Sequence, residues 1–229
     1  YFLLDMESPG VEVRPLYQIT GEAEFNEVFL TDVKIPHDRM LGREGEGWKV
    51  AITTLMNERA AIGGGVGRRG SGPISVLLDL WKNRKPGDAV AETLLRDRIA
   101  RLWIDSELLR LTNQRAKAAQ KAGNPGPEGS VGKLFMAELN KRLWECAMDV
   151  IGPESLVYEA GYGRRRPAGE SRATKLAAAK YQFLRSRANS IEGGTSEVMR
   201  NILGERVLGL PGEPRVDKDV PWKDVPRSG

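Results

Sequence analysis

Hydrophobic and polar positions follow two different rules along the chain. Over residues 1–46, apolar and polar residues alternate in short runs (FLLDM, VEVRPL and EFNEVFLTDVKIP), and turn-forming stretches such as ESPG separate them. A period of two interrupted by Gly and Pro predicts β-strands and turns. From Gly47 onward, apolar residues recur at intervals of three and four, which predicts helices.

The second part of the chain divides into helices separated by polar, Gly-rich loops. The expected helices cover residues 48–81, 89–122, the stretch around 135–150, 173–190 and 195–208. Thr195 is a predicted N-cap, since its hydroxyl can accept from first-turn amides. The sequence therefore predicts an α+β, mostly α fold: the remnant of a β-domain over 1–46, an antiparallel helix bundle over 47–210 and an extended tail over 211–229.

Composition narrows the class of protein. The 229 residues are 40% hydrophobic and 29% charged, as in ordinary globular proteins. No apolar run approaches the roughly 18 residues that span a bilayer, so no membrane span is expected. The chain starts without a signal peptide, which predicts a cytoplasmic protein, and it starts without Met in mid-pattern, which predicts a piece of a longer chain.

Rare residues and charge exclude several chemistries. With one cysteine (Cys146) and one histidine (His37), the chain has no internal disulfide, and no metal site or Ser-His-Asp triad is expected. Cys146 fits a small buried hydrophobe. The net charge of +4 comes from 35 basic and 31 acidic residues that are interspersed. The basic run Arg164–Arg166 has no aromatic interleaving, so an anionic small ligand is favoured over nucleic acid.

Six glycines crowd residues 56–72, MNERAAIGGGVGRRGSG, and Gly65, Gly67 and Gly70 match the GxGxxG fingerprint. A dinucleotide site needs a strand before the glycines, whereas a helical segment precedes them here. We therefore reject a phosphate-binding loop. The glycines are expected inside a helix, where their cost of about 1 kcal/mol each calls for a close approach by another helix or a ligand.

A second Gly-rich motif is SIEGGTSEVMRNILGERVLGLPGEP, residues 190–214. It combines a Gly-Gly turn, a Thr cap and an amphipathic helix. The amides of Gly193, Gly194 and Thr195 could bind an anion or a carbonyl oxygen at a helix N-terminus. The pattern alone favours a plain helix start over such a site.

Three stretches together resemble the C-terminal half of an acyl-CoA dehydrogenase: ITGEAEFNEVFLTDVKIP, EGWKVAITTLMNERAAIGGG and GGTSEVMRNILGERVLGLP. The resemblance runs from residue 1 to about 214. It implies the second half of a middle β-domain, a C-terminal helix bundle and FAD as cofactor. It also implies a role in fatty acid metabolism, in which a carboxylate removes the α-proton of an acyl-CoA thioester while a β-hydride passes to the flavin.

The resemblance also suggests which carboxylate is the base. The medium-chain branch has a Glu directly before the Gly-Thr of the last loop, where this chain has Gly193. In the isovaleryl and long-chain branches, the final loop carries Gly and the base lies in a Glu-Arg pair on the first bundle helix. Glu58 matches that base, with Glu192 as the fallback. Gly193 keeps the role of donating its backbone amide to the thioester carbonyl.

Other positions matching the family concern binding. Arg59 matches a position near the CoA end of the substrate site. Arg84 stands in Asn83-Arg84-Lys85-Pro86-Gly87, where the family has Arg-x-x-Phe-Gly and contacts FAD across a subunit boundary. The remaining cofactor-binding candidates are Asp149 and Gly152, which correspond to a Gln-x-x-Gly-Gly motif that reaches a neighbour's FAD, and Thr195 and Glu197, which match positions at the FAD diphosphate and ribose.

The expected partners are an acyl-CoA substrate, an electron-transfer flavoprotein as acceptor, and further copies of the chain in a dimer or tetramer. The family's N-terminal domain and the segment holding the flavin ring have no counterpart in the sequence, which predicts weak FAD binding by this chain alone. Two alternatives stay open. One is a non-catalytic partner subunit of a hetero-oligomer, although Glu58 is retained, and the other is a helical binding module.

Overall fold

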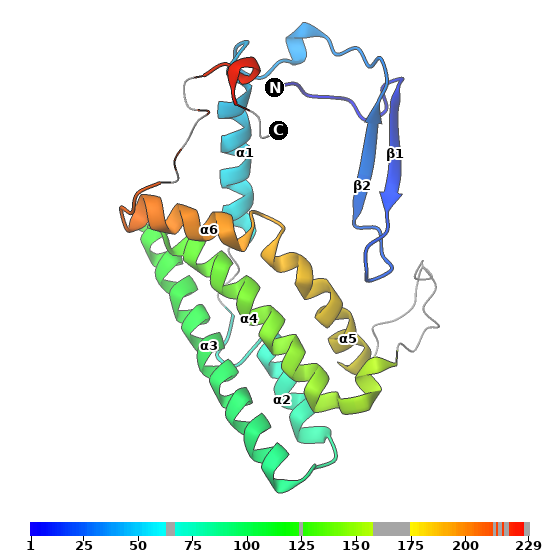
Figure 1. Ribbon diagram of the computed structural model, residues 1–229, viewed down its shortest axis with the longest axis vertical. Helices are drawn as coiled ribbons and strands as arrows, with labels where there is room; N and C mark the ends of the chain where they lie inside the picture. Colours follow the sequence, from blue (N-terminus) through cyan, green and yellow to red (C-terminus); the bar gives the residue numbers. More distant parts are fainter. Residues whose placement is uncertain are drawn as a thin grey trace.

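The computed structural model describes residues 1–62, 67–123, 126–157, 175–212, 214, 217 and 220–226. Most of these residues are helical, and a two-stranded sheet lies near the N-terminus (Figure 1). The α+β, mostly helical fold class is therefore confirmed. The division of the chain at residues 46 and 210 stays a prediction.

The sheet is one antiparallel hairpin. Strands β1 (Val11–Leu16) and β2 (Phe25–Leu30) pair so that Val11 lies opposite Leu30 and Leu16 opposite Phe25. The strand expected at FLLDM is wrong. That segment makes one isolated bridge, between Phe2 and Met40, because only the short stretch after the 3₁₀ turn η1 (His37–Arg39) runs beside it.

The hairpin exposes apolar side chains on both of its faces. Six of them are 40–57% exposed: Val13, Leu16, Phe25, Val28, Phe29 and Leu30. A lone hairpin is marginally stable in water, so it depends on other contacts. Two polar contacts join the β1–β2 connection to a bundle helix: the Tyr181 hydroxyl donates to Glu22 over 2.7 Å, and Arg185 donates to Glu24 over 2.9 Å.

The first bundle helix is shorter than predicted. Instead of one helix over 48–81, the chain forms α1 (Gly47–Ile62) and α2 (Pro73–Asn83). Gly70 and Gly72 have φ of 69° and 83°, which helices do not accommodate, and Pro73 suits the first position of a new helix. The expectation of a glycine-rich helix is thus wrong for residues 67–72. Residues 63–66, including Gly65, lie outside the described residues.

The turn before α2 is tied to the next helix through one carboxylate. Glu107 accepts from the Gly70 amide over 3.0 Å and from Arg110 Nε over 2.9 Å. Burial raises the pKa of Glu107, but these hydrogen bonds outweigh it and leave the pKa below its ordinary value. An added Cβ at Gly70 would meet Trp103 at an ordinary 3.8 Å, and none of the described atoms lies within 4 Å of one at Gly72. These two glycines shape a turn and do not serve a close approach.

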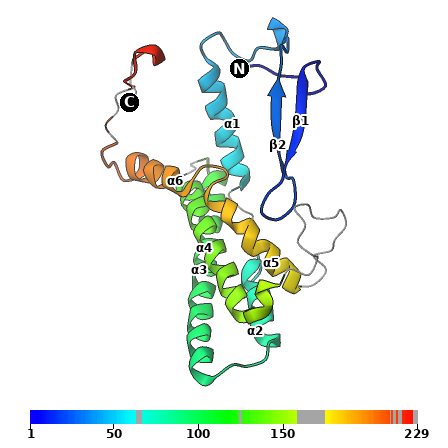
Figure 2. The same ribbon diagram turned by 45° about the vertical axis from the view of Figure 1, so that its right-hand side comes forward.

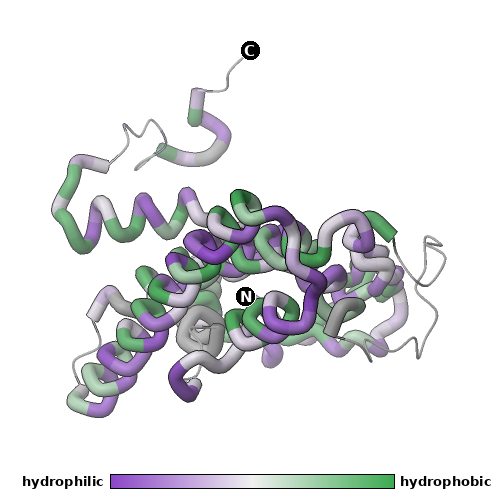
Figure 3. The backbone as a smooth tube through the Cα atoms, turned by 90° about the horizontal axis from the view of Figure 1, so that it is seen from below, coloured by the Kyte–Doolittle hydropathy of each residue, from purple (hydrophilic) through white to green (hydrophobic). Residues whose placement is uncertain are grey.

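Helix α4 is the centre of the bundle. It packs against α2, α3, α5 and α6 (Figures 1 and 2). Seen from below, hydrophobic and hydrophilic positions alternate along the helices, as they do in helices with one buried face (Figure 3). The bundle helices after α2 are α3 (Ala89–Lys121), α4 (Glu128–Ile151), α5 (Lys175–Arg185) and α6 (Ser196–Ile202).

The core lies between α2, α3, α4 and α5, and it contains the apolar stripes expected from the helical spacing. Its buried members are Ile74, Leu77, Ile99, Leu102, Leu139, Leu143, Trp144, Cys146, Ala147, Val150 and Ala179. The interpretation of Cys146 as a small buried hydrophobe is confirmed, since this residue is 0% exposed. Burial also raises the pKa of its thiol to about 11, which disfavours the thiolate form that a nucleophile requires.

The last two predicted helices change type before they end. Helix α5 gives way to the 3₁₀ turn η3 (Ser186–Ser190), and α6 continues as a π-helical turn, η4 (Leu203–Val207). In the tail, the described residues include one 3₁₀ turn, η5 (Trp222–Asp224). The basic run Arg164–Arg166 lies outside the described residues.

Candidate functional site

A tight turn leads from η3 to α6, and together with the last two residues of η3 it forms the segment 189–195, called here the 189–195 loop. Gly193 and Gly194 have φ of 64° and 100°, a region that favours glycine, so the chain reverses here without strain. Thr195 Oγ1 accepts from the Val198 amide over 3.2 Å, which confirms the predicted N-cap. The Gly-Gly pair and the cap together fix the direction in which α6 leaves the loop.

Several amides of this loop have no acceptor within the described part of the protein. The amides of Ile191 and Glu192 both donate to the Ala188 carbonyl over 2.9 Å. Among the described residues, no acceptor is found for the amides of Gly193, Gly194 and Thr195. Within the described residues, these three consecutive N–H groups are therefore unpaired.

A buried lysine holds this loop from inside the bundle. Lys133, on α4, is 2% exposed. Its ammonium donates to the Asn189 carbonyl over 3.1 Å and to the Gly194 carbonyl. On the same helix, Asn140 Nδ2 donates to Asn189 Oδ1 over 3.1 Å. Neither Lys133 nor Asn140 was identified from the sequence. The available signal was a lysine one helical turn before Ala137, on the buried face of the helix.

Glu192, the fallback base, is engaged in an ion pair. Arg185 donates to its two carboxylate oxygens over 3.1 and 3.0 Å, and Asn189 donates over 2.9 Å. Burial raises the pKa of Glu192, but the hydrogen bonds from Arg185 and Asn189 outweigh it and hold the pKa below its ordinary value. Arg185 also binds Glu24 in the β1–β2 connection. A carboxylate held in this way is a weak base.

The pH dependence of stability is expected to report this ion pair. The folded-state pKa of Glu192 is below the unfolded value of about 4.3, so the pair stabilises the fold above that pH and its contribution is lost as pH falls through the folded-state pKa. Between about pH 5 and pH 3, the wild type should lose more unfolding free energy than Glu192→Gln in urea titrations. The control is Glu197→Gln, at a carboxylate 76% exposed. Parallel pH curves for the wild type and Glu192→Gln would contradict the expectation.

The candidate base lies on α1. Both Glu58 and Arg59 belong to this helix, four and three residues before its end at Ile62. Their side chains lie outside the described residues. The C-terminal end of α1 meets the bundle where α6 begins (Figures 1 and 2). The backbone thus brings the Glu-Arg pair and the 189–195 loop to the same end of the bundle.

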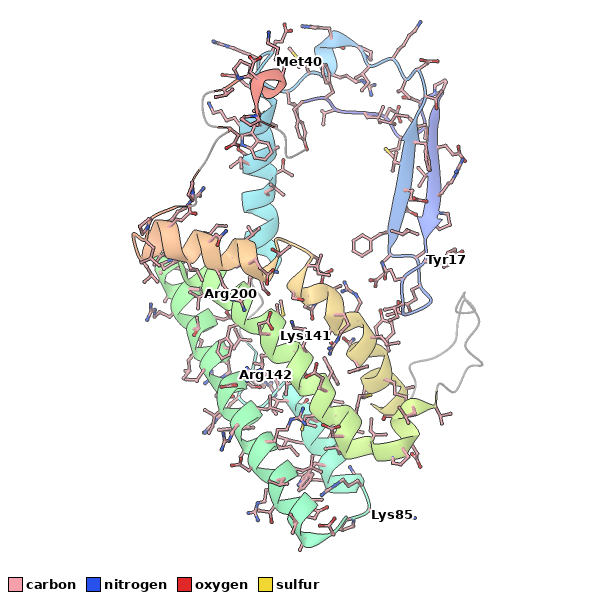
Figure 4. The ribbon with its side chains drawn as sticks, viewed as in Figure 1. Tyr17, Met40, Lys85, Lys141, Arg142 and Arg200 are labelled. Atoms are coloured by element: carbon pink, nitrogen blue, oxygen red, sulfur yellow. The ribbon has the colours of Figure 1, made fainter. Side chains whose placement is uncertain are left out.

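Three cofactor candidates lie at the other end of the bundle. Arg84 is in the α2–α3 turn, beside Lys85, far from α6 and Arg200 (Figure 4). Its guanidinium lies 3.2 Å from the centre of the Trp81 ring, donates to the Trp81 carbonyl over 2.5 Å and pairs with Glu92. The Arg84 side chain is therefore engaged by its own chain.

Asp149 and Gly152 lie near the C-terminal end of α4. The Asp149 carboxylate forms an ion pair with Arg98 of α3 and is 57% exposed. Gly152 has a φ of 73° and ends the helix. Of the candidates at the α6 end, Thr195 is used as a cap, and Glu197 forms an exposed pair with Arg200 over 3.2 Å. The structure thus divides the cofactor candidates between two ends of the bundle.

A cavity of about 260 Å³ lies between the N-terminal end of α2 and helices α3 and α4. Its wall combines apolar side chains with Arg68, Arg110 and Asn113. Asn140 belongs to the same wall and also donates to Asn189. The inner side of the 189–195 loop is therefore one side chain away from this cavity.

Among the described residues, no three His, Cys, Asp or Glu side chains gather as a metal site would require. No helix of that part of the chain is both long and apolar enough to cross a bilayer.

Comparison with known proteins identifies similar chains. The family model for the acyl-CoA dehydrogenase C-terminal domain matches residues 45–208. The chain is 36% identical over 213 residues to acyl-CoA dehydrogenase IpdE1 of Mycobacterium tuberculosis. The matched residues make up 93% of this chain and 51% of that protein. The chain therefore spans about half the length of this curated relative.

Solved structures share the fold. The ChsE4-ChsE5 complex from Mycobacterium tuberculosis matches with a TM-score of 0.70 at 21% identity, over 93% of this chain and 53% of that one. The FAD complex of PigA matches with a TM-score of 0.67 at 22% identity, over 92% and 52%. The matched fold thus makes up about half of each of these two chains.

Proposed function

Because this chain belongs to the acyl-CoA dehydrogenase family, we propose that it serves the FAD-dependent α,β-dehydrogenation of an acyl-CoA thioester, with Glu58 as the base. One observation carries the proposal: the Glu58-Arg59 pair on α1 and the glycine loop 189–195 lie at the same end of the bundle. A base and a carbonyl-binding loop are the two elements that α-proton removal from a thioester requires.

The roles of the chain's own residues follow from their chemistry. Glu58 takes the Cα proton. The uncharged Ala-Ala-Ile-Gly-Gly-Gly that follows the Glu58-Arg59 pair suits an apolar acyl group, next to which a carboxylate becomes more basic. The Gly193 amide binds the thioester oxygen and stabilises the negative charge that develops there. Arg59 binds the phosphate or pantetheine portion of CoA. Glu192 holds the loop through Arg185 and does not act as the base.

The residues present fit FAD only at the end of the bundle where α6 begins. When bound, FAD would supply the hydride acceptor, with an electron-transfer flavoprotein as the next acceptor. Thr195 and Glu197 would contact its diphosphate and ribose, beside the loop amides that have no acceptor among the described residues. At the other end, the Arg84 side chain is 14% exposed, pairs with Glu92 and lies over Trp81 of its own chain, which does not suit a contact to a neighbour's FAD.

This difference between the two ends favours a hetero-oligomer as a second candidate. In a homo-oligomer each copy would serve its neighbour's FAD through Arg84, Asp149 and Gly152. A partner subunit with a different sequence would remove that requirement and leave this chain its own Glu58. The ChsE4-ChsE5 complex shares the fold, which makes such an assembly a reasonable model. We propose this arrangement over the homo-oligomer.

The exposed hairpin supports the proposal that further strands complete the cleft. The two apolar faces of β1 and β2 would pack against polypeptide corresponding to the half of the relatives that this chain does not match. Without that wall the flavin ring has no complete site. The 229-residue chain alone is therefore expected to bind FAD weakly and to show little or no turnover.

A flavin titration of the purified chain tests this expectation. The absorbance of bound flavin and the thermal shift on adding acyl-CoA or an oligonucleotide are measured for the chain alone. They are measured again for the chain co-expressed with a partner subunit or with polypeptide corresponding to the half of the relatives that it does not match. A shift by acyl-CoA and flavin retention only on co-expression would support the proposal. Stoichiometric yellow flavin on the chain alone would contradict the weak-binding expectation, and a shift only by oligonucleotide would favour the binding module.

A further inference from the structure

We propose that Lys133 is the positioning residue of the 189–195 loop, the group that aims the loop amides at the thioester oxygen. This inference rests on the proposed function. Lys133 Nζ donates to the carbonyls of Asn189 and Gly194, which are five residues apart and bracket the loop. One ammonium group thus fixes both ends of the segment that carries the Gly193 amide.

The direction of the loop amides follows from peptide geometry. In a trans peptide the carbonyl and the amide of the same unit point in opposite directions. Because the Gly194 carbonyl points to Lys133 inside the bundle, the Thr195 amide of that unit points away from the ammonium. Gly193 and Gly194 both have positive φ, so their own amides lie on the turn that Lys133 tethers. Without the tether, glycine's wide conformational freedom would let these amides turn.

The charge of Lys133 adds to its geometric role. A carbonyl that accepts from a cation is polarised, and the amide of the same peptide becomes a stronger donor. The ammonium is 2% exposed, so water screens its field little. The positive charge of Lys133 therefore lies behind the loop amides. These amides would face the negative charge that develops on the thioester oxygen.

A purely structural role would have different consequences, and the chain provides a matched control. Lys180, on α5, is 5% exposed, and its ammonium donates to the Val157 carbonyl over 2.7 Å. Lys133→Met and Lys180→Met each remove a buried ammonium that binds backbone carbonyls. Only the first removes contacts to the 189–195 loop.

The experiment compares these two variants with the wild type as the assembled, FAD-loaded enzyme. Hydrogen exchange of the segment 186–199 is measured, together with kcat and the infrared carbonyl frequency of a bound enoyl-CoA labelled with ¹³C at the thioester. We expect Lys133→Met to speed exchange in this segment, lower kcat by about 10–100-fold and shift the carbonyl frequency back toward its value in water. Lys180→Met should change none of the three, whatever its melting temperature.

The outcomes separate this inference from the proposed function. If the wild-type enzyme fails to lower the carbonyl frequency, the proposed function fails, and the exchange comparison still tests the tether. If the wild type lowers it and folded Lys133→Met does so equally with unchanged kcat, the inference is overturned. Should Lys133→Met fail to fold, Lys133→Gln, which keeps two N–H donors without the charge, is measured in its place. Failure of both variants to fold would assign Lys133 to stability alone and overturn the proposal.

Discussion

Glu58→Gln is expected to lower kcat for acyl-CoA dehydrogenation by about 10²–10⁴-fold, the usual contribution of a general base. Glutamine has nearly the same shape as glutamate but cannot take up the Cα proton. The dissociation constant of acyl-CoA should change little, because the amide still fills the same space. Flavin bleaching by a series of acyl-CoA thioesters in the assembled enzyme measures both quantities.

The control for this prediction is Glu192→Gln. Since the Glu192 carboxylate is paired with Arg185 and its pKa is below its ordinary value, its loss should slow bleaching far less than the loss of Glu58. Undiminished bleaching in Glu58→Gln would exclude Glu58 as the base. If Glu192→Gln were the inactive variant, the fallback assignment would hold.

Leu77→Ala should have the largest effect on stability, a loss of about 2–5 kcal/mol in the free energy of unfolding. Leu77 is 0% exposed and lies on α2, within the core that α2 shares with α3 and α4. Alanine would leave a cavity at the point where α2 docks. For a chain of this size, we expect a fall in melting temperature of roughly 5–15 °C, measured by calorimetry or circular dichroism.

Leu156→Ala is the matched control, because that leucine is 88% exposed. A surface truncation of this kind is expected to change the free energy of unfolding by no more than about 0.5 kcal/mol. Equal melting temperatures for Leu77→Ala and the wild type would show that α2 is not docked on the bundle as described.

The spacing of hydrophobic residues predicted much of the fold. The stripe that includes Leu139, Leu143 and Ala147 lies in the core of α4 because burial on one face of a long helix leaves a clear period. The break before α2 was missed, although Gly72-Pro73 is a recognisable helix start. The apolar period continues across it, and spacing alone does not register a change of helix axis. The FLLDM strand failed because a strand needs a partner, and a short run does not specify one.

The site was predictable in part, for a different reason. The Thr195 cap depends on contacts within one turn, so local sequence predicted it. The Lys133 tether joins α4 to carbonyls 56 and 61 residues further along the chain, and no local pattern indicates which carbonyls a lysine will meet. The engagement of Arg84 by Glu92 and Trp81 was equally hidden, since the resemblance supplies a position and not its neighbours.

The contacts that join the hairpin to α5 have a consequence for protein synthesis. Glu22 and Glu24 precede their partners Tyr181 and Arg185 by 159 and 161 residues. At about 5–20 residues per second, the hairpin leaves the ribosome roughly 8–30 s before α5 exists to hold it. During that interval the hairpin lacks both contacts to α5, and its unpaired strand edges are open to other nascent chains. We therefore expect a chaperone to bind the nascent chain at β1 and β2 during this interval.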